Sequence, residues 1–320
     1  MGLGYTEVVS ILLVIATALA ALLYGLAWLL ATRPVGGAAR RLAAGAGGAG
    51  LAGAGQDGTG QDGAAAEPGS APVAGARVDA GSVLVFAALV AHAWALYAAM
   101  QAGGGFRFGF AHALSATFWV GVLILWVEGL TVRIDALRTV VLPIAALMCL
   151  LPVPFPGSDF AAERAQPLLL PHLIVGTLAY GVLMLAAFHA TLMTAAEKAL
   201  HRAARADASP FARWLESLPP LLVLERILFR FIGVGFVLLT LTALSGIVFS
   251  EQVFGRPLRL DHKTVFTIIS WFVFAVLLVG RRIRGWRGRT ALRLTLAGFT
   301  LLLLAYVGTR FVLEVILHRG

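Results

Sequence analysis

The stretch "LLLPHLIVGTLAYGVLMLAAFHATLMT", residues 168–194, contains no charged side chain over its whole length. A helix needs roughly 20 apolar residues to cross the hydrocarbon core of a bilayer. Backbone in lipid must also satisfy its hydrogen bonds internally, which a helix does. The stretch therefore predicts a membrane-spanning helix, and a histidine, His172, lies near its start, directly after Pro171.

The rest of the chain has the same character. Of its 320 residues, 59% are hydrophobic and 13% are charged, whereas a soluble domain has roughly 25% charged residues. The apolar runs are continuous and lack the alternation of barrel strands. We therefore expect an all-α, polytopic integral membrane helix bundle of about eight transmembrane helices. The expected spans are residues 8–30, 83–100, 108–126, 140–153, 168–194, 232–249, 264–279 and 294–317, the fourth being short and containing Pro143.

Composition divides the chain into three parts. Residues 1–32 are expected to form a first transmembrane helix, which lacks the basic start of a cleavable signal. Residues 33–80 are rich in glycine and alanine without apolar periodicity, which is typical of a disordered linker. Residues 81–320 are expected to form the main transmembrane domain.

The charge distribution predicts the orientation. The net charge is +9, and basic residues of membrane proteins collect in cytoplasmic loops, so we expect no nucleic-acid partner. Eighteen of the 25 Lys and Arg lie in the loops after the first, third, fifth and seventh spans. Because these loops alternate, we expect a multi-pass membrane protein with these loops in the cytoplasm and both termini outside.

This topology places four of the seven histidines at the outer face: His112, His172, His262 and His318. His92 lies midway along the second span, where a polar group is costly and indicates function. A neutral imidazole binds haem iron well, and the macrodipole at a helix start disfavours the charged form of His172. Two histidines from different helices suit the two faces of a haem.

Cations at the same face suit the propionates of a haem. Arg256 and Lys263 lie in the outer loop between the sixth and seventh spans, and Arg310 lies in the outer part of the last span. Such side chains pair with carboxylates near a surface. Each of these residues also has an interpretation without haem. The histidines would be solvent-exposed interfacial residues, the loop cations would be solvated, and Arg310 would form an i,i+4 pair with Glu314.

Other chemistries have little support. The single cysteine, Cys149, allows neither an internal disulfide nor a CxxCH site for covalent haem. The sequence has no HExxH metal motif and no Walker A loop. It therefore offers no motif for these chemistries.

Four segments resemble the haem-handling CcsA/CcmC/CcmF family of cytochrome c assembly proteins, and within it the YpjD-like branch. They are "PHLIVGTLAYGVLMLAAFHATLM" (171–193), "ERILFRFIGVGFVLLTLTALSGIVFSEQVFG" (225–255), "LDHKTVFTIISWFVFAVLLVGRRIRGWRG" (260–288) and "GTRFVLEVILHRG" (308–320). The resemblance extends from about residue 83 to the C-terminus. It departs at the family's tryptophan-rich WGxWWxWD loop, which is replaced by "SEQVFGRPLRLDHK", residues 250–263. Asp261 and Lys263 keep the Asp–x–Lys register of that loop, with His262 between them.

The resemblance implies that haem b is held non-covalently at the outer face between His172 and His318 as iron ligands. It also implies that the haem is presented to apocytochrome c together with other assembly proteins. His92 would mark a route for haem through the membrane. The resemblance thus predicts a haem-handling membrane protein of cytochrome c maturation in the bacterial inner membrane, an assembly factor more than a free-standing enzyme.

Two alternatives remain open. A non-haem membrane transport component or regulator would keep the same fold, and the absence of a Soret band would identify it. A cytochrome-like electron carrier would hold its haem stably, and a redox titration would reveal it.

Overall fold

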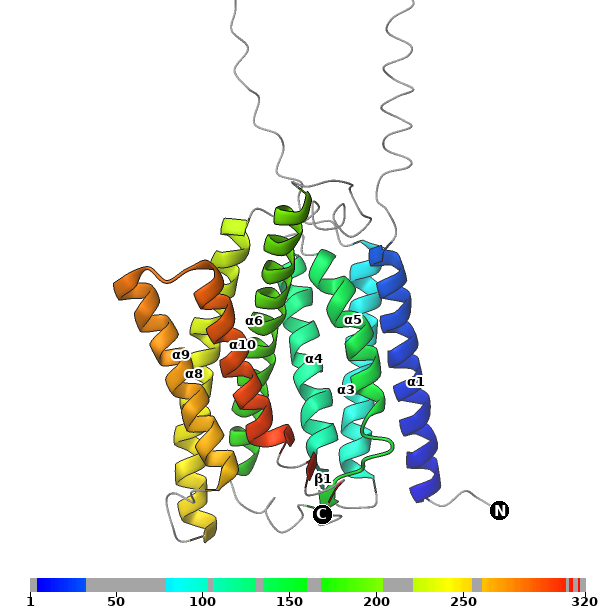
Figure 1. The fold of residues 1–320 in the computed structure, drawn as a ribbon. Helices are drawn as coiled ribbons and strands as arrows, with labels where there is room; N and C mark the ends of the chain where they lie inside the picture. Colours follow the sequence, from blue (N-terminus) through cyan, green and yellow to red (C-terminus); the bar gives the residue numbers. More distant parts are fainter. Residues whose placement is uncertain are drawn as a thin grey trace, which may run out of the picture.

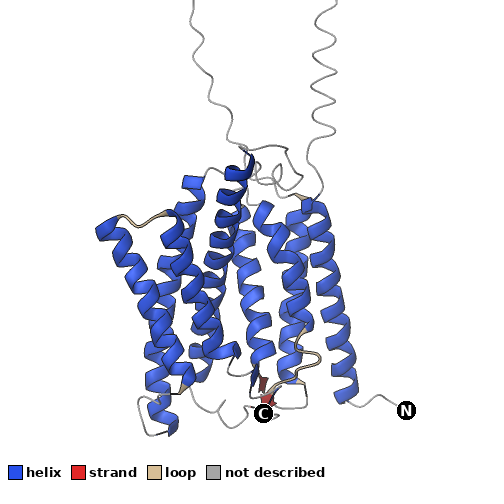
Figure 2. Ribbon diagram, in the orientation of Figure 1, coloured by secondary structure: helices blue, strands red, loops and turns tan. Residues whose placement is uncertain are grey.

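The computed structural model describes residues 5–32, 79–102, 106–130, 135–159, 168–203, 221–254, 261–308, 311–312 and 316. These residues form one helix bundle (Figure 1), and nearly all of them are helical (Figure 2). The helices are α1 (Tyr5–Thr32), α3 (Ala80–Gln101), α4 (Phe110–Gly129), α5 (Asp135–Leu150), α6 (Leu169–Ala203), α8 (Leu221–Phe254), α9 (His262–Arg284) and α10 (Gly288–Leu303). The prediction of an all-α bundle is confirmed.

Consecutive helices run in opposite directions, so that α1, α4, α6 and α9 all begin at the lower end of Figure 1. Hydrogen bonds across the bundle agree with this arrangement. At the end of α1, the Trp28 indole donates to the carbonyl of Thr139 at the start of α5, at 3.0 Å. At the end of α4, Trp126 donates to the carbonyl of Ser82 at the start of α3, also at 3.0 Å. The helices thus alternate in direction along the chain, and which end of the bundle faces the cytoplasm stays a prediction.

Seven helices within the described residues are long and apolar enough to cross a membrane. The exception is α5, which has 16 residues and contains Pro143. At 1.5 Å per residue it is roughly 24 Å long, short of the roughly 30 Å hydrocarbon core. The fourth expected span is thus too short to cross the membrane fully, as its sequence indicates.

Helices α4 and α6 approach each other closely. A Cβ added at Gly181 of α6 would lie 2.5 Å from Cγ1 of Val120, and one added at Gly121 of α4 would lie 2.3 Å from Cε of Met184. Small residues allow membrane helices to approach closely, which replaces the hydrophobic driving force that lipid cannot supply. These two helices therefore form the interior of the bundle, whereas α8 and α9 lie at its edge.

Two details differ from the sequence-based expectation. Two short strands, β1 (Arg107–Phe108) and β2 (Ser158–Asp159), pair antiparallel at the end of the bundle where α4 begins. Two residues are too few to produce a readable alternation, which explains why the sequence shows no strand. The last expected span, 294–317, is not a single α-helix, because α10 ends at Leu303 and a π-helical turn, Leu304–Gly308, follows.

Helix ends are set by local chemistry. The Asp79 carboxylate caps α3 by accepting from the amide of Ser82, and the Asp261 carboxylate caps α9 by accepting from the amide of Thr264. Such caps satisfy amides that have no partner inside the helix. At the other end of α9, Gly285 adopts φ 64°, a left-handed conformation that glycine tolerates and that ends the helix. The predicted linker, residues 33–80, lies almost wholly outside the described residues.

Candidate functional site

The site is built around His172, which lies in the first turn of α6. Its Nδ1 lies 2.9 Å from Oγ of Ser245, which belongs to α8. The neighbouring Gly246 makes this approach possible, because a Cβ at that position would lie 3.2 Å from Cε1 of the imidazole. The ring therefore lies against the backbone of α8 and is half-buried between two helices.

The hydrogen bonds around His172 favour one tautomer. The Ser245 hydroxyl donates its proton to the carbonyl of Thr242, one turn earlier in α8, at 3.1 Å. With its proton used there, the serine oxygen suits an imidazole that carries its hydrogen on Nδ1. A neutral imidazole protonated at Nδ1 has its lone pair on Nε2, the nitrogen it offers to a metal. A second-shell partner of this kind fixes both the tautomer and the ring orientation of a metal-binding histidine.

The start of α9 adds charge at the same end of the bundle. Asp261 accepts hydrogen bonds from both the amide and the hydroxyl of Thr264, at 2.8 Å each. His262 and Lys263 follow it and are exposed. Nζ of Lys263 lies 5.3 Å above the ring of Tyr306 in the π-helical turn, and the lysine side chain lies within electrostatic reach of His172. The structure therefore brings together His172, Lys263 and the segment after α10.

Three of the predicted site residues, His318, Arg256 and Arg310, lie outside the described residues. The segment that leads toward His318 is nevertheless anchored at this end. The Tyr180 hydroxyl of α6 donates to the carbonyl of Leu302 in α10 at 2.7 Å. The pairing of His172 with His318 thus stays a prediction.

His92 occupies a separate place, buried between α1, α3 and α4. Its Nδ1 lies 3.1 Å from the Tyr24 hydroxyl, and its Nε2 lies 2.8 Å from the Ser115 hydroxyl. Both ring nitrogens are therefore used by hydroxyl groups of neighbouring helices, as buried polar groups in a membrane require. In this state His92 fastens three helices together, and its role as a haem ligand stays a prediction.

Two further histidines are buried. His112 lies in the first turn of α4, and neither ring nitrogen meets hydrogen-bond geometry with a described group, although the Ala99 carbonyl faces the ring. His189 bonds the Leu185 carbonyl of its own helix at 3.1 Å, and its ring packs edge-on against Phe231. Of the histidines predicted at the outer face, His112 is therefore wholly buried, whereas His172 and His262 are accessible.

The sequence alone did not identify Ser245 and Gly246 as parts of the site. The two residues are adjacent within an apolar run, and Ser245 is 73 positions away from His172. A hydroxyl beside a glycine in a membrane helix is a signal for close helix contact. The sequence does not show which helix makes that contact.

Comparison with known proteins places the chain among membrane proteins of cytochrome assembly. Residues 80–317 match the family described as Cytochrome C assembly protein. The chain is 33% identical over 161 residues to the Inner membrane protein YpjD of Escherichia coli (strain K12), covering 50% of this chain and 58% of that protein. The match therefore spans little more than half the length of that relative.

Shorter matches reach the Cytochrome c biogenesis protein CcsA of two cyanobacteria. The identity is 34% over 91 residues with Gloeobacter violaceus, covering 28% of this chain and 27% of the relative. It is 38% over 85 residues with Synechocystis, covering 27% of this chain and 25% of the relative. No solved structure matches the chain.

Proposed function

Since the chain belongs to the cytochrome c assembly protein family, we propose that it handles haem during cytochrome c maturation. Haem is the cargo: the protein holds it at the outer face of the bacterial inner membrane and passes it to apocytochrome c. His172 and His318 are the two iron ligands in this proposal. The names of the relatives, Cytochrome c biogenesis protein and Inner membrane protein, support the process and the location.

One observation carries the proposal: the hydrogen-bond chain from His172 through Ser245 to the Thr242 carbonyl. This hydrogen-bond chain suits a neutral imidazole with its lone pair on Nε2, which is the form that binds iron. The residues present at this end therefore fit a haem iron.

The cations at this end suit the carboxylates of the cargo. Lys263 is exposed at the start of α9, where a propionate is able to reach it without leaving water. Arg256 and Arg310 are further candidates for the same role. The Asp261 carboxylate is occupied as the cap of α9, so we assign it to positioning Lys263 and His262 rather than to the cargo.

One observation favours a second function. The segment 250–263 contains no tryptophan, although the resembling family has a tryptophan-rich loop there. A membrane transport component or regulator without haem would need no such loop. A purified protein without any Soret band, in either oxidation state, would favour this alternative.

The test is a set of absorption spectra of the purified full chain loaded with haem. We expect a six-coordinate, low-spin spectrum for the wild type and a weaker, high-spin spectrum for His172→Ala or His318→Ala. The double variant should retain no haem. His201→Ala is the control, because His201 lies at the opposite end of α6. Unchanged haem retention in the double variant would contradict the assignment.

A further inference from the structure

The turn between α9 and α10 concentrates positive charge. Six arginines lie within thirteen residues, with no lysine among them: Arg281, Arg282, Arg284, Arg287, Arg289 and Arg293. The turn lies at the periphery of the bundle, at the upper left of Figure 1. It is at the opposite end from His172, so it is unrelated to the proposed haem site.

The length of α9 places these arginines at the depth of lipid headgroups. The helix has 23 residues, which at 1.5 Å per residue is roughly 34 Å. This length slightly exceeds the roughly 30 Å hydrocarbon core. If α9 begins at one membrane surface, its last turn, which holds Arg281, Arg282 and Arg284, ends at the other surface rather than far out in water.

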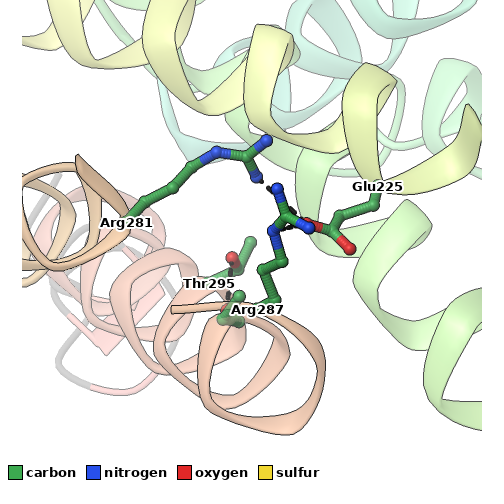
Figure 3. A network of polar contacts seen from close by, with 5 residues as sticks. Glu225, Arg281, Arg287 and Thr295 are labelled. Carbon is green, nitrogen blue, oxygen red and sulfur yellow. Dashed lines mark hydrogen bonds and ion pairs between the residues drawn. The ribbon is translucent and has the colours of Figure 1, made fainter. Parts of the chain in front are cut away.

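Protein carboxylates neutralise only part of this charge. Glu225 of α8 accepts from Arg281 at 3.3 Å and forms an ion pair with Arg287 at 3.5 Å, as Figure 3 shows. Glu197 of α6 lies 3.7 Å from Arg289. The Arg281 guanidinium also lies 3.4 Å from the centre of the Phe229 ring, which fixes it against α8. Arg281, Arg287 and Arg289 thus hold α9 and α10 against the bundle.

The remaining three arginines are available to a ligand. Arg282, Arg284 and Arg293 are exposed, and within the described part of the chain none of them has an acidic partner. Arginine binds phosphate through a planar fork of donors, more selectively than lysine does. The free charge at this turn therefore suits a phosphate group.

An exposed apolar face of α9, called here the apolar track, runs along the helix to these arginines. Large exposed apolar side chains recur every three or four residues on one face: Val265, Ile269, Phe272, Val276, Val279 and Ile283. Ile283 is 77% exposed and lies between Arg282 and Arg284. A face of this kind contacts acyl chains, and the two arginines flank it at the level of the headgroup.

We propose that the α9–α10 turn is a binding site for an anionic phospholipid. Arg282 and Arg284 bind the headgroup phosphate, Arg293 adds to the positive field, and the acyl chains lie along the exposed face of α9. Glu225 supports the site by holding Arg281 and Arg287 on the inner side of the turn. The bound lipid then neutralises the charge that the protein leaves unpaired.

The test measures lipid preference on the full chain by native mass spectrometry. Phosphatidylglycerol and phosphatidylcholine with identical acyl chains are supplied in equal amounts, and the ratio of their single adducts is recorded. Each arginine near an anionic headgroup changes binding by about fivefold at low salt. We expect Arg282→Gln/Arg284→Gln to lower the wild-type ratio by roughly 5- to 25-fold, and rising salt to lower the wild-type ratio as well.

Arg40→Gln/Arg41→Gln removes the same charge from the glycine-rich segment and is the matched control, which should keep the wild-type ratio. Equal losses in both double variants would overturn the site in favour of a general charge effect. A wild type without preference for phosphatidylglycerol would overturn it regardless of any variant. Displacement of the lipid by equimolar glycerophosphoglycerol, which has no acyl chains, would show that the track on α9 contributes nothing.

Discussion

Replacing Ser245 by alanine removes the hydroxyl that lies 2.9 Å from Nδ1 of His172. The imidazole then loses the partner that selects its tautomer and orients its ring. One hydrogen bond contributes about 0.5–1.5 kcal/mol net, and loss of a partner that orients a metal-binding histidine typically costs 10- to 100-fold in affinity. Because His172 is only half-buried and water is able to replace part of the bond, we expect haem affinity to fall about tenfold.

Two measurements follow this change. A haem titration monitored at the Soret band gives the affinity, and ¹⁵N chemical shifts of the histidine ring report the tautomer in haem-free protein. Thr191→Ala is the control, because the Thr191 hydroxyl bonds the Ala187 carbonyl of its own helix. Wild-type affinity together with an unchanged Nδ1–H signal in Ser245→Ala would refute the reasoning. A changed tautomer without haem binding would instead refute the proposed function alone.

Three further predictions concern helix contacts and topology. Gly246→Ala should weaken haem binding severalfold, because the new methyl group would lie 3.2 Å from the imidazole. Gly233→Ala in the same helix is the control and should leave haem binding unchanged, because its methyl group meets no atom within 4 Å. Equal haem affinities of the two variants in a titration would contradict this prediction. His92→Ala should lower the stability of the bundle by roughly 2–4 kcal/mol in a thermal unfolding assay, because two buried hydroxyl groups lose their partner. An unchanged unfolding transition would contradict the role of His92 in linking the three helices. Reporter fusions after Gly288 should read cytoplasmic and fusions after Gly255 external, and the reverse pattern would overturn the orientation.

Much of the fold was predictable because membrane helices carry their signal locally. A run without charges, such as residues 168–194, identifies its helix by itself, since lipid leaves the backbone no alternative. The short fourth helix was likewise readable from its length and from Pro143. The orientation predicted from the charged loops stays a prediction, because the bundle alone does not show which end faces the cytoplasm. Caps such as Asp79 and Asp261 lie directly before the helices they begin.

The partners of the predicted site residues were not predictable. Tyr24 and His92 are 68 positions apart, and His172 and Ser245 are 73 positions apart. Which helices meet depends on packing, and similar apolar runs give no preference between partners. The burial of His112 has the same origin, because the packing of the bundle covers the first residues of its helix, including Phe110 and Ala111. The sequence therefore indicated the residue types of the site and left their neighbours undetermined.

The most direct test of the proposed haem site is chemical rescue of a His172→Gly variant. Glycine leaves a space where the imidazole was, and free imidazole is able to enter it and bind the iron. We predict a low-spin spectrum for the haem-loaded wild type, a high-spin spectrum for His172→Gly, and return of the low-spin spectrum on adding imidazole. A wild type that binds no haem, or a His172→Gly variant that keeps the low-spin spectrum without imidazole, would contradict the account.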